Sequence, residues 1–430
     1  MTSNKPKKTR GAAFWIIFSL GVIAALGLMF WLTHAKKVST LIELSYGPSD
    51  PSFANTLGPA VGAEFLEGNA VQTLVNGDEF FPSMLQAIRE AKNTITLETY
   101  IWESGKISDQ FIEVLEERAR AGVRINVIVD GMGTLKFKDE DWARLEASGV
   151  KLLKYGREHW YDIKANINHR THRKSLVIDG RVGFTGGMCI ADKWMGNATS
   201  ADQWRDTQVR VEGPVVREMQ AVFATNWLQT TSTFLVAEVY FPAIPSAGKA
   251  RAQCFKSGPG EGAEAGRLSY LFAIAAARKS IEISHAYFVP DDLAIETLIA
   301  ARHRGVRIRV IVPAINDSRI GRAASRSRWG KLLAAGVEFY QFEPAMFHCK
   351  TMIVDDLFVT VGSVNFDNRS FQINDEISLN VLDRDMARDH LKIFENDLRH
   401  SQPLTREEFE NRPFYIKLSD HLSGLIRSQL

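Results

Sequence analysis

The sequence predicts two similar α/β units in tandem, each with a largely parallel or mixed sheet, preceded by one N-terminal transmembrane helix. Three observations lead to this prediction: strand patterns alternate with helix patterns, an ordered series of segments occurs twice, and a long uncharged run lies near the N-terminus. The chain has 430 residues, more than one hydrophobic core usually serves. Two fused units therefore fit its length better than one.

The composition is that of an ordinary globular protein. Hydrophobic residues make up 45%, charged residues 24%, and the net charge is only +2. This lacks the basic excess of a dedicated nucleic-acid binder, so no nucleic acid is expected as a partner. The cysteines Cys189, Cys254 and Cys349 are scattered, and form neither a metal-binding cluster nor a disulfide framework in the sequence.

Residues 11–33 predict a membrane span. This uncharged run is long enough to cross a hydrocarbon core of about 30 Å, and Trp15 and Trp31 lie near its ends, where aromatic rings favour the interface. More basic residues precede the run than follow it, which favours a cytoplasmic N-terminus. A cleaved signal peptide is the rival interpretation, but the run is longer than a signal core and no clear cleavage site follows.

The series of predicted elements beyond this span occurs twice in the same order. Residues 85–95 match 271–281 as a helix entering a strand, and residues 121–129 match 304–312 as a glycine-ended helix followed by a Val/Ile-rich strand. We therefore divide the chain into a basic tail (1–10), a transmembrane anchor (11–33), a linker rich in Ser, Pro and Gly (34–63), two repeats (64–245 and 246–400) and a C-terminal tail (401–430).

Each repeat contains the same constellation, His-x-Lys-x4-Asp. It comprises His172, Lys174 and Asp179 in the first repeat, and His348, Lys350 and Asp355 in the second. The residues after each histidine are apolar and β-branched, which predicts a buried strand with His and Lys on one face. The Asp lies an odd number of positions from the His and should face the other way, so we expect a structural role for it.

Two histidines and two lysines suit phosphodiester transfer. The reaction needs a nucleophile, a proton donor for the leaving oxygen and positive charge around the phosphorus. Histidine serves either of the first two roles because its unperturbed pKa is about 6.5, and lysine supplies the charge. A single His-x-Lys would be an accident, but two matches at the same place in two repeats are a strong signal.

On these motifs the chain resembles the phospholipase D superfamily over residues 64–400. The resemblance implies two α/β/α sandwich units packed together, a covalent phosphohistidine on one motif histidine, protonation of the leaving alcohol by the other, and no metal or organic cofactor. Asn365 in Gly362-Ser-Val-Asn365 matches the family asparagine that helps to hold the phosphate. The first repeat departs from this pattern, since Cys189 takes that place, and we interpret Cys189 as a buried apolar residue.

The resemblance also implies a carboxylate that orients each histidine. Asp206, 34 residues beyond His172, and Glu376, 28 residues beyond His348, fit this role. Either could instead belong to an ordinary solvated ion pair.

Within the superfamily the sequence is most similar to bacterial cardiolipin synthases, through Gly186-Gly-Met188 and residues 204–214 and 362–371. Such enzymes transfer a phosphatidyl group from one phospholipid, commonly phosphatidylglycerol, to a hydroxyl of another. The likeness implies phospholipid substrates. With the predicted span and its flanking charges, we expect a single-pass location in the bacterial inner membrane with the catalytic part outside the cytoplasm. We choose His172 as the nucleophile. The alternatives are a phospholipase D-type hydrolase, with a nuclease less supported, and a non-catalytic membrane scaffold. The oligomeric state is left open.

Two further patterns have open interpretations. The C-terminal tail places Phe414, Leu418, Leu422, Leu425 and Ile426 at helical spacing, and this apolar face either caps the core or lies on a bilayer. A basic cluster either receives an anionic headgroup or is a solvated helix face. Its members are Arg319, Arg322, Arg326, Arg328 and Lys331.

Overall fold

A computed structural model describes residues 14–15, 18–21, 38–156, 169–236, 238–259 and 262–425. The chain divides into two compact units, Met1–Thr40 and Leu41–Leu430. The predicted transmembrane anchor, residues 11–33, lies for the most part outside the described residues. No helix within the described ranges has the length and apolarity needed to cross a membrane.

Part of the predicted linker is a helix, which corrects the sequence-based assignment of residues 34–63. Helix α2 (Pro51–Val61) begins after Asp50, whose side chain accepts a hydrogen bond from the backbone N–H of Ser52, and it ends at Gly62 with a left-handed φ of 73°. Phe53 and Leu57 are fully buried, because α2 packs against helix α7 (Ala265–Ala276) of the second repeat.

Within the described residues the two repeats have the same order of strands, and the second repeat has one more helix. The first contains β1 (Leu66–Val75), α3 (Asn76–Glu90), β2 (Thr94–Thr99), α4 (Lys106–Arg120), β3 (Arg124–Asp130), α5 (Asp139–Ala147), β4 (Lys151–Tyr155), β5 (Ser175–Ile178), β6 (Val182–Gly186), the short helix η1 (Asp192–Trp194), β7 (Thr207–Glu212) and α6 (Val216–Thr231). The second contains β8 (Ala250–Ser257), α7, β9 (Ser280–His285), α8 (Asp292–His303), β10 (Arg307–Ile315), α9 (Arg319–Arg326), α10 (Trp329–Ala334), β11 (Glu338–Met346), β12 (Lys350–Val354), β13 (Phe358–Gly362), α11 (Asn368–Gln372), β14 (Glu376–Leu382) and α12 (Arg384–Arg399).

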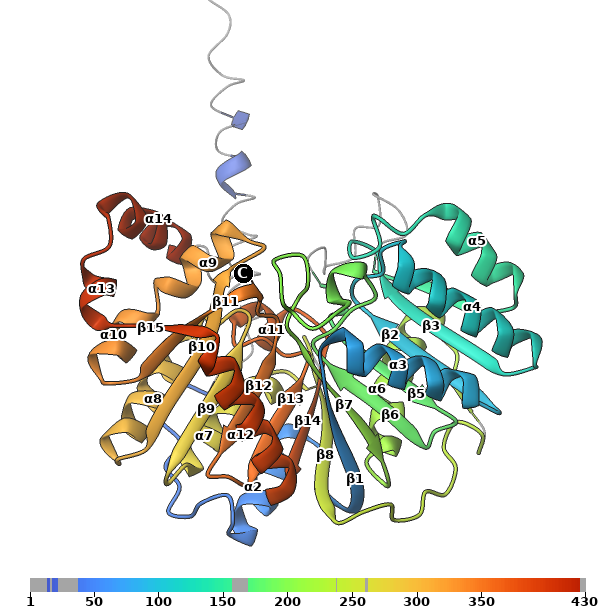
Figure 1. Ribbon diagram of the computed structural model, residues 1–430, viewed down its shortest axis with the longest axis horizontal. Coiled ribbons are helices and arrows are strands. Elements are labelled where there is room, and N and C mark those ends of the chain that lie inside the picture. Colours follow the sequence, from blue (N-terminus) through green and yellow to red (C-terminus); the bar gives the residue numbers. More distant parts are fainter. Residues whose placement is uncertain are drawn as a thin grey trace, which may run out of the picture. The chain divides into compact units, whose positions relative to one another are not determined.

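The strands of both repeats form one mixed sheet of 15 strands, in the order β15-β11-β10-β9-β12-β13-β14-β8-β1-β7-β6-β5-β2-β3-β4. In each repeat three strands are parallel, β2, β3 and β4 or β9, β10 and β11, and the others are antiparallel. The repeats meet where β1 and β8 run antiparallel, with Leu66 opposite Ala252 (Figure 1). The predicted repeated α/β fold with a mixed sheet is therefore confirmed.

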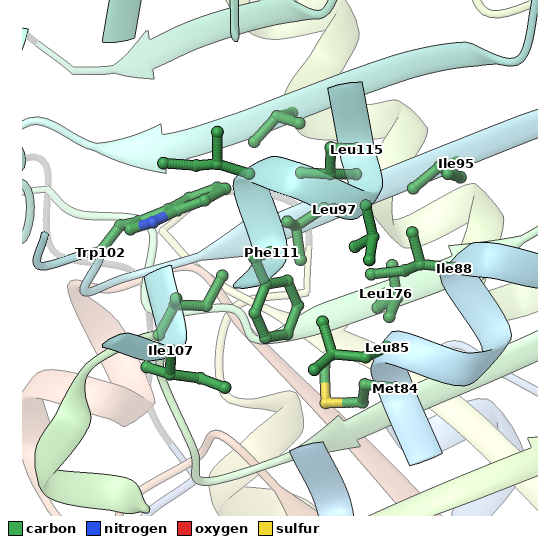
Figure 2. Packing of buried hydrophobic residues seen from close by; sticks show 14 of the residues in the cluster. Met84, Leu85, Ile88, Ile95, Leu97, Trp102, Ile107, Phe111, Leu115 and Leu176 are labelled. Atoms are coloured by element: carbon green, nitrogen blue, oxygen red, sulfur yellow. The ribbon is translucent and has the colours of Figure 1, made fainter. Parts of the chain in front are cut away.

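Helices cover both faces of this sheet, so its central strands are buried on both sides. Along β3, Val127 and Val129 belong to the hydrophobic cluster under α3 and α4, whereas Ile128 packs with Phe223 and Trp227 of α6. Figure 2 shows the first cluster, in which side chains of α3 and α4 interdigitate with those of β2 and β5.

A second hydrophobic cluster extends across the junction of the repeats. It contains Val209 and Val211 from β7 together with Val359, Val361 and Leu379 from β13 and β14. The two repeats therefore share part of one hydrophobic core, so strands of one repeat pack against strands of the other.

The C-terminal tail adds three elements. Strand β15 (Ser401–Leu404) pairs antiparallel with β11 and extends the sheet of the second repeat. Helices α13 (Arg406–Glu410) and α14 (Phe414–Leu425) follow, and α14 packs beside α9 (Figure 1). Ile426, the last residue of the predicted apolar face, lies outside the described residues.

Candidate active site

Each motif histidine lies in a segment just before a central strand, β5 for His172 and β12 for His348. Both segments hydrogen-bond to the backbone of the other repeat. The backbone N–H of His172 donates to the carbonyl of Asp375 at 2.8 Å, and that of His348 donates to the carbonyl of Arg205 at 2.7 Å. The two histidines are thus positioned by the junction of the repeats, which brings residues 176 positions apart in the sequence into one site.

The carboxylates near the histidines are exchanged between the repeats. Nδ1 of His172 lies 2.9 Å from both Oε1 and Oε2 of Glu376, and Nδ1 of His348 lies 2.8 Å from Oδ2 of Asp206. The distances along the chain associated each carboxylate with the histidine of its own repeat, and this association is wrong. Spacing along the chain was a poor guide because two backbone bridges, between residues 171 and 375 and between 205 and 347, join the two repeats. Each bridge brings a histidine of one repeat next to the carboxylate of the other.

Both carboxylates are completely buried and are held by further hydrogen bonds. Glu376 accepts from the hydroxyls of Ser363 and Ser370, and Asp206 accepts from Nε1 of Trp194 at 2.9 Å and from the backbone N–H of Thr207 at 2.8 Å. Burial opposes ionisation of each carboxyl, but the neighbouring histidine and the hydrogen bonds outweigh it and hold the pKa of both below the ordinary value. Both are therefore anionic acceptors for Nδ1.

Two glycines make room for these carboxylates. A Cβ atom on Gly187 would lie 2.3 Å from Oδ1 of Asp206, and one on Gly362 would lie 2.4 Å from the carbonyl oxygen of Ile377, next to Glu376. Neither distance is tolerable for a side chain. Because glycine has no side chain, the backbone at Gly187 and Gly362 can pack directly against the segments that carry Asp206 and Glu376. This close packing holds the two carboxylates in place.

The lysines of the motifs are buried beside the histidines. Nζ of Lys174 donates to the carbonyl of His172 at 2.7 Å and lies over the ring of Tyr100. Nζ of Lys350 donates to the carbonyl of His348 at 2.8 Å and lies 3.1 Å from Nε2 of the same residue. Burial lowers the pKa of Lys350 to about 8, against the opposing effect of Asp206.

Both histidines are neutral near pH 7 in this structure. Burial lowers the pKa of His172 to about 4, although Glu376 partly opposes it, and burial together with Lys350 lowers the pKa of His348 to about 3. A neutral imidazole beside a carboxylate carries its proton on Nδ1. Nε2 of each ring then presents its lone pair, which is what a nucleophile or a general base requires.

The two histidines line one cavity of about 380 Å³, open to the surface, together with Lys174, Cys189 and Asn365. Oδ1 of Asn365 is buried and has no hydrogen-bond partner among the described residues, so it is available to a ligand. Cys189 is also part of the hydrophobic cluster of the first repeat, as expected for a buried apolar residue. Two imidazoles and several cationic side chains thus line one space.

The aspartates of the two motifs lie away from this cavity. Asp179 accepts hydrogen bonds from the backbone N–H groups of Lys92, Asn93 and Thr94 at 2.7–2.8 Å. Asp355 does the same for residues 278–280 at 2.7–3.1 Å. Both therefore join the end of the motif strand to the beginning of the neighbouring strand.

Several cavity residues were not identified from the sequence: Tyr100, Arg170, Lys193, Trp204, Tyr287, Asp317, Asp367, Arg369 and Asn374. One signal was present for two of them, since Lys193 and Arg369 each follow their motif histidine by 21 residues. A strict alignment of the repeats would have found this pair. The aromatic residues near the histidines, Tyr100 and Trp204, have no such matching signal.

The basic cluster of the second repeat does not line the cavity. Only Ser318 and Gly321, at the beginning of α9, do so. Arg326 pairs with Asp420 and Arg328 pairs with Asp292, which neither interpretation of the cluster anticipated. His169 pairs with Asp375 at 3.0 Å, as a polar neighbour of the site.

Known proteins resemble this chain in sequence across both repeats. The family model for the cardiolipin synthase, phospholipase D-like domain matches residues 84–227 and 270–398, one segment in each repeat. Cardiolipin synthase of Geobacillus kaustophilus is 34% identical over 355 residues, which are 82% of this chain and 71% of the relative. The probable cardiolipin synthase YwiE of Bacillus subtilis is 33% identical over 343 residues, 80% of this chain and 68% of the relative.

Two solved structures share the fold at low sequence identity. Phosphatidylserine synthase of Haemophilus influenzae has a TM-score of 0.63 and 14% identity, covering 88% of this chain and all of the other. Polyphosphate kinase of Porphyromonas gingivalis has a TM-score of 0.53 and 13% identity, covering 91% of this chain and 57% of the other. The similarity in sequence and family model is more specific than this likeness of fold, and it shows that the chain belongs to the cardiolipin synthase family of phospholipase D-like phosphatidyltransferases.

Proposed function

We propose that this protein makes cardiolipin by transferring the phosphatidyl group of one phosphatidylglycerol to a hydroxyl of another, with release of glycerol. The observation that carries the proposal is the pair of histidines that face one cavity while a carboxylate from the opposite repeat holds Nδ1 of each. The substrate comes from the family to which the chain belongs, since the sequence relatives are cardiolipin synthases.

In the first step Nε2 of His172 attacks the phosphorus of the donor. A P–N bond forms, the P–O bond to the headgroup glycerol breaks, and His348 gives its proton to the leaving oxygen. Lys174, Lys350 and the amide of Asn365 stabilise the charge on the non-bridging oxygens. The products of this step are a phosphatidyl-histidine and free glycerol.

In the second step the headgroup hydroxyl of the second phosphatidylglycerol enters. His348, now neutral, accepts the proton of this hydroxyl as its oxygen attacks the phosphorus, and the P–N bond breaks. His172 returns to its neutral state and His348 to its protonated state. One phosphodiester is broken and one is formed, so no external energy source is required.

The choice of His172 as nucleophile rests on the surroundings of the two Nε2 atoms. The ammonium of Lys350 lies 3.1 Å from Nε2 and 3.2 Å from Nδ1 of His348, so its positive charge stands beside that ring, whereas no hydrogen bond to Nε2 of His172 is found among the described residues. This nearby positive charge makes the imidazole of His348 the poorer nucleophile of the two. A bound phosphodiester anion offsets the positive field of the lysines and raises the pKa of His348, so we expect proton uptake when substrate binds.

The location of the enzyme is inferred from the sequence. The predicted span at residues 11–33 would keep the catalytic unit beside its lipid substrates, on the extracytoplasmic side of the bacterial inner membrane.

The test is an assay of the purified full-length protein with phosphatidylglycerol labelled in the phosphate. We expect a labelled diphosphatidyl product and one glycerol released for each molecule formed. Labelled phosphatidic acid without the diphosphatidyl product would contradict the proposal and favour hydrolysis. The variants H172A and H348A should both lose turnover, and only H348A should trap labelled phosphate on the protein. Trapping on H172A alone would reverse the assignment of nucleophile and acid.

A further inference from the structure

Helix α14 exposes most of its large apolar side chains and buries its one acidic residue. Phe414, Tyr415, Leu418, Leu422 and Leu425 are between 45% and 77% exposed, whereas Asp420 is 1% exposed. This is the reverse of the usual amphipathic helix of a globular protein, whose apolar face turns to the core. The apolar face of the tail therefore does not cap the core, one of the two interpretations that the sequence allowed.

Specific contacts hold α14 in this orientation. The carboxylate of Asp420 accepts hydrogen bonds from Arg326 of α9, at 2.8 and 3.1 Å, and from Arg412 at 3.0 Å. Gly424 lies so close to Ser327 that a Cβ would be 3.0 Å from its hydroxyl. Rotating the apolar face inward would break these ion pairs and leave the largely buried guanidinium groups of Arg326 and Arg412 without their carboxylate, which opposes the rotation.

Other exposed apolar side chains lie on both sides of the cavity. Ile320 and Ile315 are exposed beside Ser318, which lines the cavity. In the first repeat, Met132 and Leu135 are exposed in the loop that follows β3, the strand equivalent to β10. This loop adjoins the opposite wall, because the carbonyl of Gly133 accepts a hydrogen bond from Trp102, next to the cavity residues Tyr100 and Ile101.

We propose that these residues form an apolar rim that inserts into the interfacial layer of an anionic bilayer, so that the cavity opens directly onto lipid. The apolar rim consists of Met132, Leu135, Ile315, Ile320, Phe414, Tyr415, Leu418, Leu422 and Leu425. The proposal deepens the proposed function and rests on it for the nature of the substrate. Large side chains of this kind, next to a cavity that takes an amphiphile, gain free energy by leaving water for the acyl boundary.

The charges beside the apolar rim favour an anionic lipid surface over a second copy of the chain. Arg319 and Lys417 are exposed and Arg322 is half-buried, and none of the three forms a direct ion pair with a described residue, although Arg322 is within electrostatic reach of Asp420. The acidic residue of α14, Asp420, is buried and neutralised by two arginines. A second copy would bring the same basic residues together and would cover the cavity, whereas anionic headgroups would pair with them and supply the substrate.

The position of the rim can be measured in the full-length protein with a single labelled cysteine. The three native cysteines are buried, so a cysteine introduced at L418C or L135C is labelled selectively with an environment-sensitive fluorophore. The protein is reconstituted in vesicles of phosphatidylcholine alone or mixed with phosphatidylglycerol. The predicted anchor is present in every variant, so the label reports on the rim and not on membrane attachment.

We expect the labels at positions 418 and 135 to be blue-shifted and quenched by lipid-borne quenchers, more strongly with phosphatidylglycerol. K92C, at the exposed residue Lys92 just before β2 and at the end of that strand remote from the cavity residue Tyr100, should remain accessible to aqueous iodide. Equal iodide quenching at all three positions would overturn the proposal. A blue shift that depends on protein concentration in detergent, without vesicles, would assign the rim to a second copy instead.

Turnover separates this proposal from the proposed function. The triple variant F414S/L418S/L422S changes exposed side chains only, and we expect turnover on vesicles to fall on the order of tenfold or more. Turnover on a monomeric short-chain phosphatidylglycerol should not change. Equal loss on both substrates would contradict the proposal. If the unmodified enzyme uses neither substrate, the proposed function fails, while the quenching experiment still decides the position of the rim.

Discussion

At the scale of single residues, the chemistry depends on which nitrogen of each histidine carries the proton. The carboxylates of Glu376 and Asp206 accept from Nδ1 of His172 and His348, and thereby leave Nε2 of both without a proton. An amide in either place could donate to Nδ1 and would favour the wrong tautomer.

We therefore expect E376Q and D206N to lower turnover by about 10² to 10⁴-fold while the protein stays folded. The crossed contacts add a more specific expectation, because E376Q should shift the imidazole NMR signals of His172 and leave those of His348 nearly unchanged. D206N should do the reverse. The opposite pattern would show that each carboxylate serves the histidine of its own repeat.

Gly187 tests how closely the strand ends must approach. G187A places a Cβ where Oδ1 of Asp206 now lies, at 2.3 Å, and should displace that carboxylate from His348. A displacement of about 1 Å at a catalytic group costs about 10²-fold in rate, so kcat should fall by this factor with little change in Tm. G330A is the matched control, because its Cβ would be 3.4 Å from Phe409, and it should keep its activity.

At the scale of elements, the motif strands are joined to their neighbours by the aspartates that end them. D179A or D355A removes the acceptor for three backbone N–H groups. Each variant should lose roughly 1 to 3 kcal/mol in the free energy of unfolding, measured by chemical denaturation. The exposed residue Glu113 provides the control E113A, which should change stability little. A loss of turnover without a loss of stability would mean that these aspartates act in the chemistry itself.

The elements also show what a sequence can predict. The strands after His172 and His348 were predictable because their apolar, β-branched pattern is local. Helix α2 was missed although Asp50, Pro51 and Gly62 are capping signals, because a composition rich in Ser, Pro and Gly was given more weight.

The crossed carboxylates were beyond sequence reasoning for a different reason. They are 204 and 142 residues from their histidines, and nothing local encodes which strand of the other repeat will adjoin each one. The orientation of α14 is similar, since the helical spacing of its apolar residues was visible, but its direction depends on the pairing of Asp420 with Arg326, 94 residues away.

At the scale of the whole molecule, the buried site makes stability depend on pH. His172 and His348 have an ordinary pKa near 6.5 when unfolded, and about 4 and about 3 when folded. Between these values the unfolded chain binds more protons, so this contribution to stability is present above pH 6.5 and is lost as the pH falls toward 4. Burial raises the pKa of Asp367 and Glu218 to about 7. These two carboxyls therefore make the folded state less stable as the pH rises, which is opposite to the effect of the histidines.

Comparing the unmodified protein with a variant separates the contribution of the histidines to the pH dependence of stability from that of these carboxyls. H172Q/H348Q removes both titrations, so its free energy of unfolding should fall less than that of the unmodified protein between pH 7 and pH 5. Denaturant unfolding at the two pH values measures the difference. An equal change in both proteins would mean that folding does not lower the pKa of the two histidines.

The exchange of carboxylates between the repeats also bears on the ancestry of the protein. In a two-fold symmetric homodimer of a single ancestral unit, the histidine of each subunit would meet the carboxylate of the other, and the same site would form without gene fusion. In a single chain, by contrast, the two copies need not remain identical. The two copies differ at equivalent positions that line the cavity. Cys189 of the first repeat corresponds to Asn365 of the second, and Trp204 corresponds to Asn374, each two residues before its carboxylate. Evolution could thus specialise one histidine for the donor lipid and the other for the leaving group and the acceptor, an asymmetry that no symmetric ancestor could have had.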